Sequence, residues 1–122
     1  SERVNAIIRD FGNYISQINL DENNKIGIFG AAAKGTVFLN KFFETFTDEF
    51  FKTCYDENNL KWDYKIPGTN IIIKDPKEIV NDKITHLFIT TWNFREEIME
   101  RCKKEYGFKG RFITAIPYLR VQ

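Results

Sequence analysis

Apolar and polar positions along the chain predict amphipathic helices separated by short buried strands. In residues 1–20 the apolar positions recur every three or four residues, which is typical of a helix with one buried face. A polar run over 21–24 ends this helix, and the apolar run over 25–29 predicts a strand that is buried on both faces. The pattern over 33–46 is strongly apolar and predicts a second helix packed against the sheet.

Four further strands are expected after this helix, over 50–55, 71–73, 85–91 and 111–116, with Pro117 ending the last. Residues 61–66 are expected to be extended, and Pro67-Gly68-Thr69-Asn70 is a strong turn signal. Asp75 followed by Pro76 predicts the start of a short helix, because Asp suits the N-cap and Pro the first helical position.

A last helix is expected from Asn93 to Tyr106. Asn93 fits the N-cap with Glu96 three residues later, and Gly107 fits the position just after the helix. Residues four apart on a helix are neighbours. We therefore expect two ion pairs on its surface, Glu97–Arg101 and Glu100–Lys104.

Strands that alternate with helices imply a mostly parallel sheet with right-handed crossovers. We therefore predict an α/β, three-layer, Rossmann-like fold with a mostly parallel sheet of about five strands. The 122 residues are expected to form a single domain, with a leading amphipathic helix over 1–20 and an α/β core over 25–122. The chain starts directly in a helix, as a domain excised from a longer protein would.

Composition excludes several classes of partner. A net charge of +1 gives no electrostatic footprint for nucleic acid. Because the chain has neither an apolar stretch long enough to span a bilayer nor a signal peptide, we expect a cytoplasmic protein without a membrane partner. Cys54 and Cys102 lie far apart without metal-ligand spacing, so we expect reduced thiols and no metal site.

The most informative segment is the turn after the first strand, Gly-Ala-Ala-Ala-Lys-Gly over residues 30–35. Small residues let the backbone approach an anion, and the first turn of the next helix directs its N–H groups to the same point. The spacing of Gly30, Ala32 and Gly35 matches the dinucleotide-binding pattern with Ala as the middle residue, whereas the order Lys34-Gly35 differs from a P-loop. Lys34 is a candidate phosphate contact, and a solvated lysine is the alternative.

A ligand crevice is expected where the strand order reverses, beyond the carboxyl ends of the first and fourth strands. Residues 30–35 and the pair Trp92-Asn93 would face each other there. Asp56 follows the second strand, close to the position whose acid holds a ribose hydroxyl, and an ordinary turn aspartate is the alternative. Trp92 has two open roles, stacking on a base or sugar and covering the sheet edge, while Asn93 is most simply an N-cap.

No catalytic residue is predicted. His86 is the only histidine, and it has no visible nucleophile or metal-ligand partner, so a structural or exposed role is expected. The sequence shows no Ser/His/Asp, Cys/His or paired-carboxylate arrangement.

Four segments in order carry a resemblance that spans nearly the whole chain. They are residues 30–35 with Leu39-Asn40, then Asp56-x-Asn58-x-x-Lys61, Pro67-Gly68-Thr69-x-Ile71-x-Ile73, and Trp92-Asn93-x-x-Glu96-Glu97-Ile98. Together they resemble the C-terminal domain of S-adenosylmethionine-dependent sugar C-methyltransferases, which act on nucleotide-linked deoxysugars. Where the family often has Pro and His, this chain has Asn59 and Asn70.

The resemblance implies that this domain binds the nucleotide-sugar and completes the substrate cleft without being catalytic. S-adenosylmethionine would bind an upstream methyltransferase domain of the same polypeptide, so no cofactor is expected in this chain. Two alternatives stay open, an NAD(P)-binding Rossmann domain of an oxidoreductase or redox sensor, and a structural or dimerisation module. The substrate-binding residues that the resemblance and the turn suggest are Gly30, Ala31, Ala32, Ala33, Lys34, Gly35, Asp56, Lys61, Pro67, Gly68, Thr69, Trp92 and Asn93.

Overall fold

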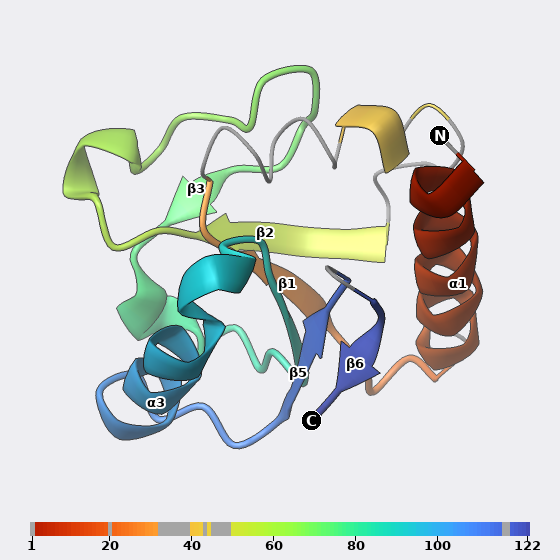
Figure 1. Ribbon diagram of the computed structural model, residues 1–122. Helices are drawn as coiled ribbons and strands as arrows, with labels where there is room; N and C mark the ends of the chain where they lie inside the picture. Colours follow the sequence, from red (N-terminus) through yellow and green to blue (C-terminus); the bar gives the residue numbers. More distant parts are fainter. Residues whose placement is uncertain (1, 20, 32–39, 43, 45–49, 116–117) are drawn as a thin grey trace.

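A six-stranded sheet forms the centre of the fold in the computed structural model, which describes residues 2–19, 21–31, 40–42, 44, 50–115 and 118–122 (Figure 1). Its strand order is β3-β2-β1-β4-β5-β6, in which the first five pair in parallel and β6 pairs with β5 in antiparallel. This order confirms the predicted Rossmann-like, mostly parallel sheet. The strands are β1 (Ile26–Phe29), β2 (Phe51–Tyr55), β3 (Ile73–Lys74), β4 (His86–Ile89), β5 (Arg111–Thr114) and β6 (Arg120–Val121).

Helices cover both faces of the sheet. α1 (Glu2–Ile18) buries Phe11 and Ile15 in a core that it shares with Ile28 of β1, whereas α3 (Arg95–Lys104) buries Cys102 in a second core with Phe29. Because successive strand residues point to opposite faces, these adjacent β1 residues belong to cores on opposite faces of the sheet. The sheet is thus the middle of three layers, with α1 and α3 well separated in Figure 1.

The second predicted helix lies mostly outside the described residues. Residues 40–42 and 44 are helical, and Phe42 is fully buried in the core beneath α1. The predicted end of the fifth strand at Pro117 also lies outside them. About five strands were predicted, and the sheet has a sixth, β6. The two residues of β6 carry no periodic pattern of their own and form a strand only by pairing with β5.

The prediction of an extended segment over 61–66 was wrong. The 3₁₀ turn η2 (Asn59–Lys61) ends where that segment was expected to begin, and the Asn58 side chain caps it by accepting a hydrogen bond from the backbone N–H of Leu60. Asp63 then takes a left-handed conformation with φ of 72°, and only an isolated bridge from Lys65 to Ile72 remains of the expected strand. The chain therefore folds back on itself before it enters β3.

The other helix ends test the capping predictions. Asp75 caps the 3₁₀ turn η3 (Pro76–Glu78) by accepting from the Lys77 N–H at 2.9 Å, as predicted. α3 ends at Lys104 with Glu105 as its C-cap, two residues before the predicted end at Tyr106. Gly107 follows with φ of 69°, and the N–H of Phe108 donates to the carbonyl of Cys102.

Asn93 is not the N-cap that the sequence predicted. It lies inside the 3₁₀ turn η4 (Trp92–Phe94), which a backbone bond from Phe94 N–H to the Thr91 carbonyl closes at 3.1 Å. α3 consequently begins at Arg95 and has no side-chain cap. On its surface the predicted Glu100–Lys104 pair forms at 2.7 Å, but the Arg101 guanidinium turns away from its own helix and contacts Glu57.

Candidate ligand crevice at the carboxyl edge of the sheet

The exits of β1 and β4 meet at Gly30. The N–H of Thr90 donates to the Phe29 carbonyl at 3.2 Å, and the Thr90 hydroxyl donates to the Gly30 carbonyl. On the other side, the Gly30 N–H donates to the carbonyl of Tyr55, the last residue of β2. Gly30 therefore lies at the point of strand-order reversal, where open α/β sheets bind their ligands.

Gly30 is required here on two grounds. Its φ is 98°, and a Cβ at this position would stand 2.8 Å from the Thr90 Oγ1 and 2.9 Å from the Thr91 Oγ1. The hydroxyl of half-buried Thr91 thus faces the backbone of the loop after β1. The sequence placed Thr91 at the end of the fourth predicted strand, next to Trp92 and Asn93, but gave it no role in the site.

Asp56 and Lys61 also converge on this loop. The Asp56 Oδ2 accepts a hydrogen bond from the Ala31 N–H at 2.8 Å, and its Oδ1 accepts from the Asn58 N–H at 2.8 Å. The Lys61 Nζ donates to the Ala31 carbonyl at 3.3 Å and lies 3.7 Å from the Asp56 Oδ2. Residues 32–35, with Lys34 among them, lie outside the described residues.

The remaining candidate residues occupy two separate turns. Trp92 and Asn93 are exposed in η4, directly after Thr91. Pro67 and Gly68 form the predicted tight turn, with φ of 80° at Gly68, and the Thr69 N–H closes it at 3.0 Å from the Ile66 carbonyl. A Cβ on Gly68 would lie 3.5 Å from the side-chain oxygen of Asn40, a residue of the first resembling segment.

An ion pair joins α3 to the segment after β2. The Arg101 guanidinium donates to both carboxylate oxygens of Glu57, at 2.8 and 2.7 Å, and the Tyr106 hydroxyl donates to the same carboxylate at 2.7 Å. The hydrogen bonds from Arg101 and Tyr106 hold the pKa of Glu57 below its ordinary value, although partial burial opposes this shift. Sequence analysis missed this link because its partners are 44 positions apart.

This lowered pKa predicts a pH-dependent contribution to stability. A carboxylate whose pKa is lower when folded stabilises the fold above its unfolded pKa of about 4.3, and the contribution disappears as pH falls through the folded pKa. We therefore expect Glu57→Gln to destabilise the protein at pH 7, by no more than about 1 kcal/mol because the pair is partly solvated.

The measurement is urea unfolding of both proteins at pH 7 and pH 3. The difference between wild type and Glu57→Gln should shrink towards pH 3. Glu96→Gln, a change at an exposed residue of α3, serves as the control and should be almost neutral at both pH values. A difference that stayed constant with pH would show that the ionised carboxylate contributes nothing.

The other reactive side chains of the described structure lie away from the crevice or are inert. His86 begins β4 at the opposite edge of the sheet, where its Nδ1 lies 2.8 Å from the Thr85 hydroxyl. Burial, helped by Arg111, lowers the pKa of His86, which favours the neutral ring. Both cysteines are free and buried as predicted, and burial raises the pKa of the Cys102 thiol to about 12.

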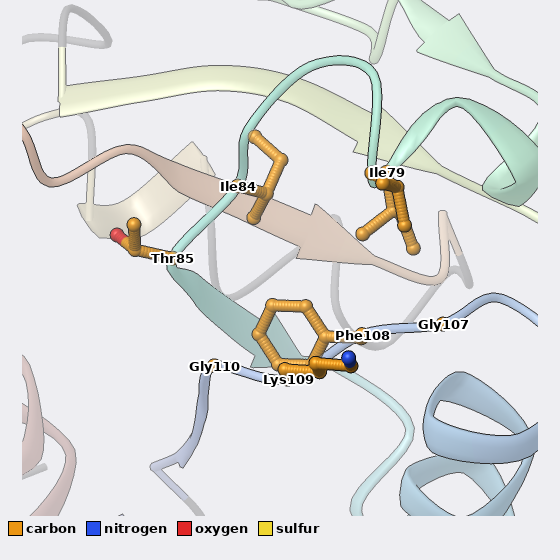
Figure 2. A pocket seen from close by; sticks show the side chains of 8 residues that line it. Ile79, Ile84, Thr85, Gly107, Phe108, Lys109 and Gly110 are labelled. Atoms are coloured by element: carbon orange, nitrogen blue, oxygen red, sulfur yellow. The ribbon is translucent and has the colours of Figure 1, made fainter.

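A pocket of about 630 Å³ lies at that opposite, amino edge of the sheet. Ile79, Ile84 and Phe108 face it, and Thr85 and Lys109 are among its lining residues (Figure 2). Its lining is mainly apolar, and it lies at the end of the strands opposite to Gly30. Within the described ranges no group of three His, Cys, Asp or Glu side chains could hold a metal, and no helix there is long and apolar enough to cross a membrane.

Known proteins resemble this chain in sequence and in fold. The family described as the C-methyltransferase C-terminal domain matches residues 1–117. C-methyltransferase NovU from Streptomyces niveus is 29% identical over 120 residues, a match that spans 98% of this chain and 27% of NovU. UDP-D-quinovosamine 4-dehydrogenase from Vibrio fischeri shares the fold, with a TM-score of 0.54 and 15% identity over 81% of this chain and 93% of the other.

Proposed function

Because the chain belongs to the family of C-methyltransferase C-terminal domains, we propose that it binds the nucleotide-sugar substrate of an S-adenosylmethionine-dependent sugar C-methyltransferase. In this proposal the domain completes a substrate cleft together with an upstream methyltransferase domain of the same polypeptide, which holds the methyl donor. NovU supports such an arrangement, since the match spans only 27% of its length.

The observation that carries the proposal is the convergence of Gly30 and Thr91 where the strand order reverses. The absence of a side chain at Gly30 lets the hydroxyl of half-buried Thr91 come close to the loop after β1, where it can donate to a diphosphate. The Lys61 side chain, 40% exposed, supplies a cation beside the same loop. The Trp92 ring is exposed one residue beyond Thr91, where a nucleotide base can stack on it.

The proposal assigns catalysis to the upstream domain. In the described part of this chain the single histidine is buried at the opposite edge of the sheet, and the two thiols have raised pKa values. Neither kind of group is placed to act on a sugar in the crevice. The domain alone is accordingly expected to transfer no methyl group to a nucleotide-sugar.

The test is calorimetric titration of the full-length enzyme with a dTDP-linked deoxysugar, with NAD and with S-adenosylmethionine. Trp92→Ala should weaken the affinity for the dTDP-sugar by about 1–3 kcal/mol, the scale of base–aromatic stacking, and leave that for S-adenosylmethionine unchanged.

Tyr64→Ala removes another exposed aromatic ring, on the segment before β3, and is the matched control with an expected neutral effect. Binding of NAD that Trp92→Ala weakens, without binding of the dTDP-sugar, would favour the oxidoreductase alternative instead. Binding of the dTDP-sugar that Trp92→Ala leaves intact would place the nucleotide elsewhere.

A further inference from the structure

We infer that Asp56 and Lys61 are positioning residues that hold the backbone of Ala31 and so fix how the chain leaves β1 at the crevice, rather than contacting the ribose. We call these two side chains and Ala31 the Ala31 clamp. The inference deepens the proposed function and rests on it for the identity of the ligand, whereas the clamp itself rests only on contacts within the chain.

The contacts of Asp56 favour holding the loop over binding a ligand. In dinucleotide-binding folds the acid at this position accepts a hydrogen bond from a ribose hydroxyl. Here each carboxylate oxygen already accepts a backbone N–H at 2.8 Å, one from Ala31 and one from Asn58. Hydrogen bonds to an ionised acceptor are strong, and Asp56 is only 9% exposed. Each oxygen keeps a second lone pair, but the buried carboxylate leaves little accessible surface for a ribose hydroxyl.

Lys61 completes the clamp from the same side. Its Nζ donates to the Ala31 carbonyl at 3.3 Å, so the donor and the acceptor of one residue are both held. The lysine also lies 3.7 Å from the Asp56 Oδ2, which offsets the carboxylate charge. Side chains therefore hold both backbone polar groups of Ala31 directly after β1 leaves the sheet.

The clamp accounts for the spacing Asp56-x-Asn58-x-x-Lys61. The carboxylate of Asp56 accepts from the Asn58 N–H, and the Asn58 side chain in turn accepts from the Leu60 N–H, which starts η2. A backbone hydrogen bond from the Lys61 N–H to the Asn58 carbonyl at 3.0 Å closes the turn. This turn brings the Lys61 side chain next to Asp56. Each residue named in the pattern thus has a role in building the clamp.

The first experiment needs no ligand. Hydrogen–deuterium exchange of the full-length protein is compared with that of Asp56→Asn and Lys61→Met. An asparagine can satisfy only one of the two N–H donors and has no charge, so we expect the Ala31 amide to exchange at least about tenfold faster in Asp56→Asn. Exchange in β5 should not change, because losing the Ala31 hydrogen bond opens only the loop after β1. Faster exchange in β5 as well would indicate general destabilisation of the protein.

Asp63→Asn is the matched control for this experiment. Asp63 is an exposed carboxylate on the same segment, and its φ of 72° is one that Asn tolerates. We expect exchange at Ala31 to be unaffected by this change. Unchanged exchange in Asp56→Asn would overturn the clamp.

The second experiment separates holding from ribose binding. Affinities for thymidine diphosphate and for its 3′-deoxy analogue are measured on the same full-length proteins. A positioning role predicts that Asp56→Asn weakens both by the same factor, roughly tenfold, because one preorganising charge-assisted hydrogen bond is lost. The double variant Asp56→Asn/Lys61→Met should lose no more than the larger single effect, since both act through Ala31.

The outcomes distinguish the clamp from the proposed function. An Asp56→Asn penalty that disappears with the 3′-deoxy analogue would identify a ribose contact and overturn the positioning role. Faster exchange at Ala31 in a protein that binds neither nucleotide would support the clamp and overturn the nucleotide-sugar proposal.

Discussion

Replacing Phe11 with alanine is expected to lower the free energy of unfolding by about 3–5 kcal/mol, the usual range for a buried phenylalanine. The ring is fully buried in the core between α1 and the sheet. Its centroid lies 4.4 Å from that of Phe88 in β4 and 5.2 Å from that of Phe42. Truncation would leave a cavity lined by rings that come from different elements and cannot all move to fill it.

Urea unfolding of the domain or of the full-length protein measures this effect. Arg9→Ala is the matched control on the same helix, because Arg9 is exposed and its ion pair with Asp10 is solvated. We expect that change to stay within about 0.5 kcal/mol. An equally small effect of Phe11→Ala would mean that α1 is not an integral part of the core.

Gly30→Ala should produce the second large effect, about 2–4 kcal/mol of lost stability, from a strained φ and an overpacked contact. The new methyl group would meet both threonine hydroxyls after β4 at less than 3.0 Å. Thr90 holds the Gly30 carbonyl and cannot move away without losing that bond. The methyl group would also push the Thr91 hydroxyl away from the loop after β1, so under the proposed function nucleotide affinity should fall in the same variant.

Gly68→Ala is the comparison that separates the cost of a positive φ from the cost of a steric clash. Its φ of 80° carries a similar conformational cost, but the added Cβ would make only an ordinary contact at 3.5 Å. We expect about 1–2 kcal/mol there. A larger loss at Gly68 than at Gly30 in thermal or urea unfolding would contradict the close approach of the two strand exits.

Periodicity predicted most of the sheet, because buried strands and amphipathic helices differ in spacing. It failed where the partner is distant in sequence. Arg101 had a good partner four residues earlier on its own helix, yet it binds Glu57, which presents two oxygens to the guanidinium. The start of α3 was misplaced for a local reason, since Asn93 lies inside η4, where the Phe94 N–H donates to the Thr91 carbonyl and the Arg95 N–H to the Trp92 carbonyl.

The candidate crevice was predictable in outline but not in its contacts. Parallel topology alone placed the exits of β1 and β4 side by side. The role of Asp56 was not visible, because the amide it holds belongs to Ala31, 25 positions earlier, and reaches it only through the pairing of β1 with β2. Thr91 belongs to no motif, and its position against Gly30 follows from the register of β1 with β4.

The neighbouring residues Asp56 and Glu57 connect the two segments that flank the proposed crevice, the loop after β1 and helix α3. The first carboxylate fixes the backbone that leaves β1, and the second fixes α3, which begins where η4 ends. Under the proposed function, a ligand would meet these two segments already held in place, so less conformational entropy would be lost when it binds.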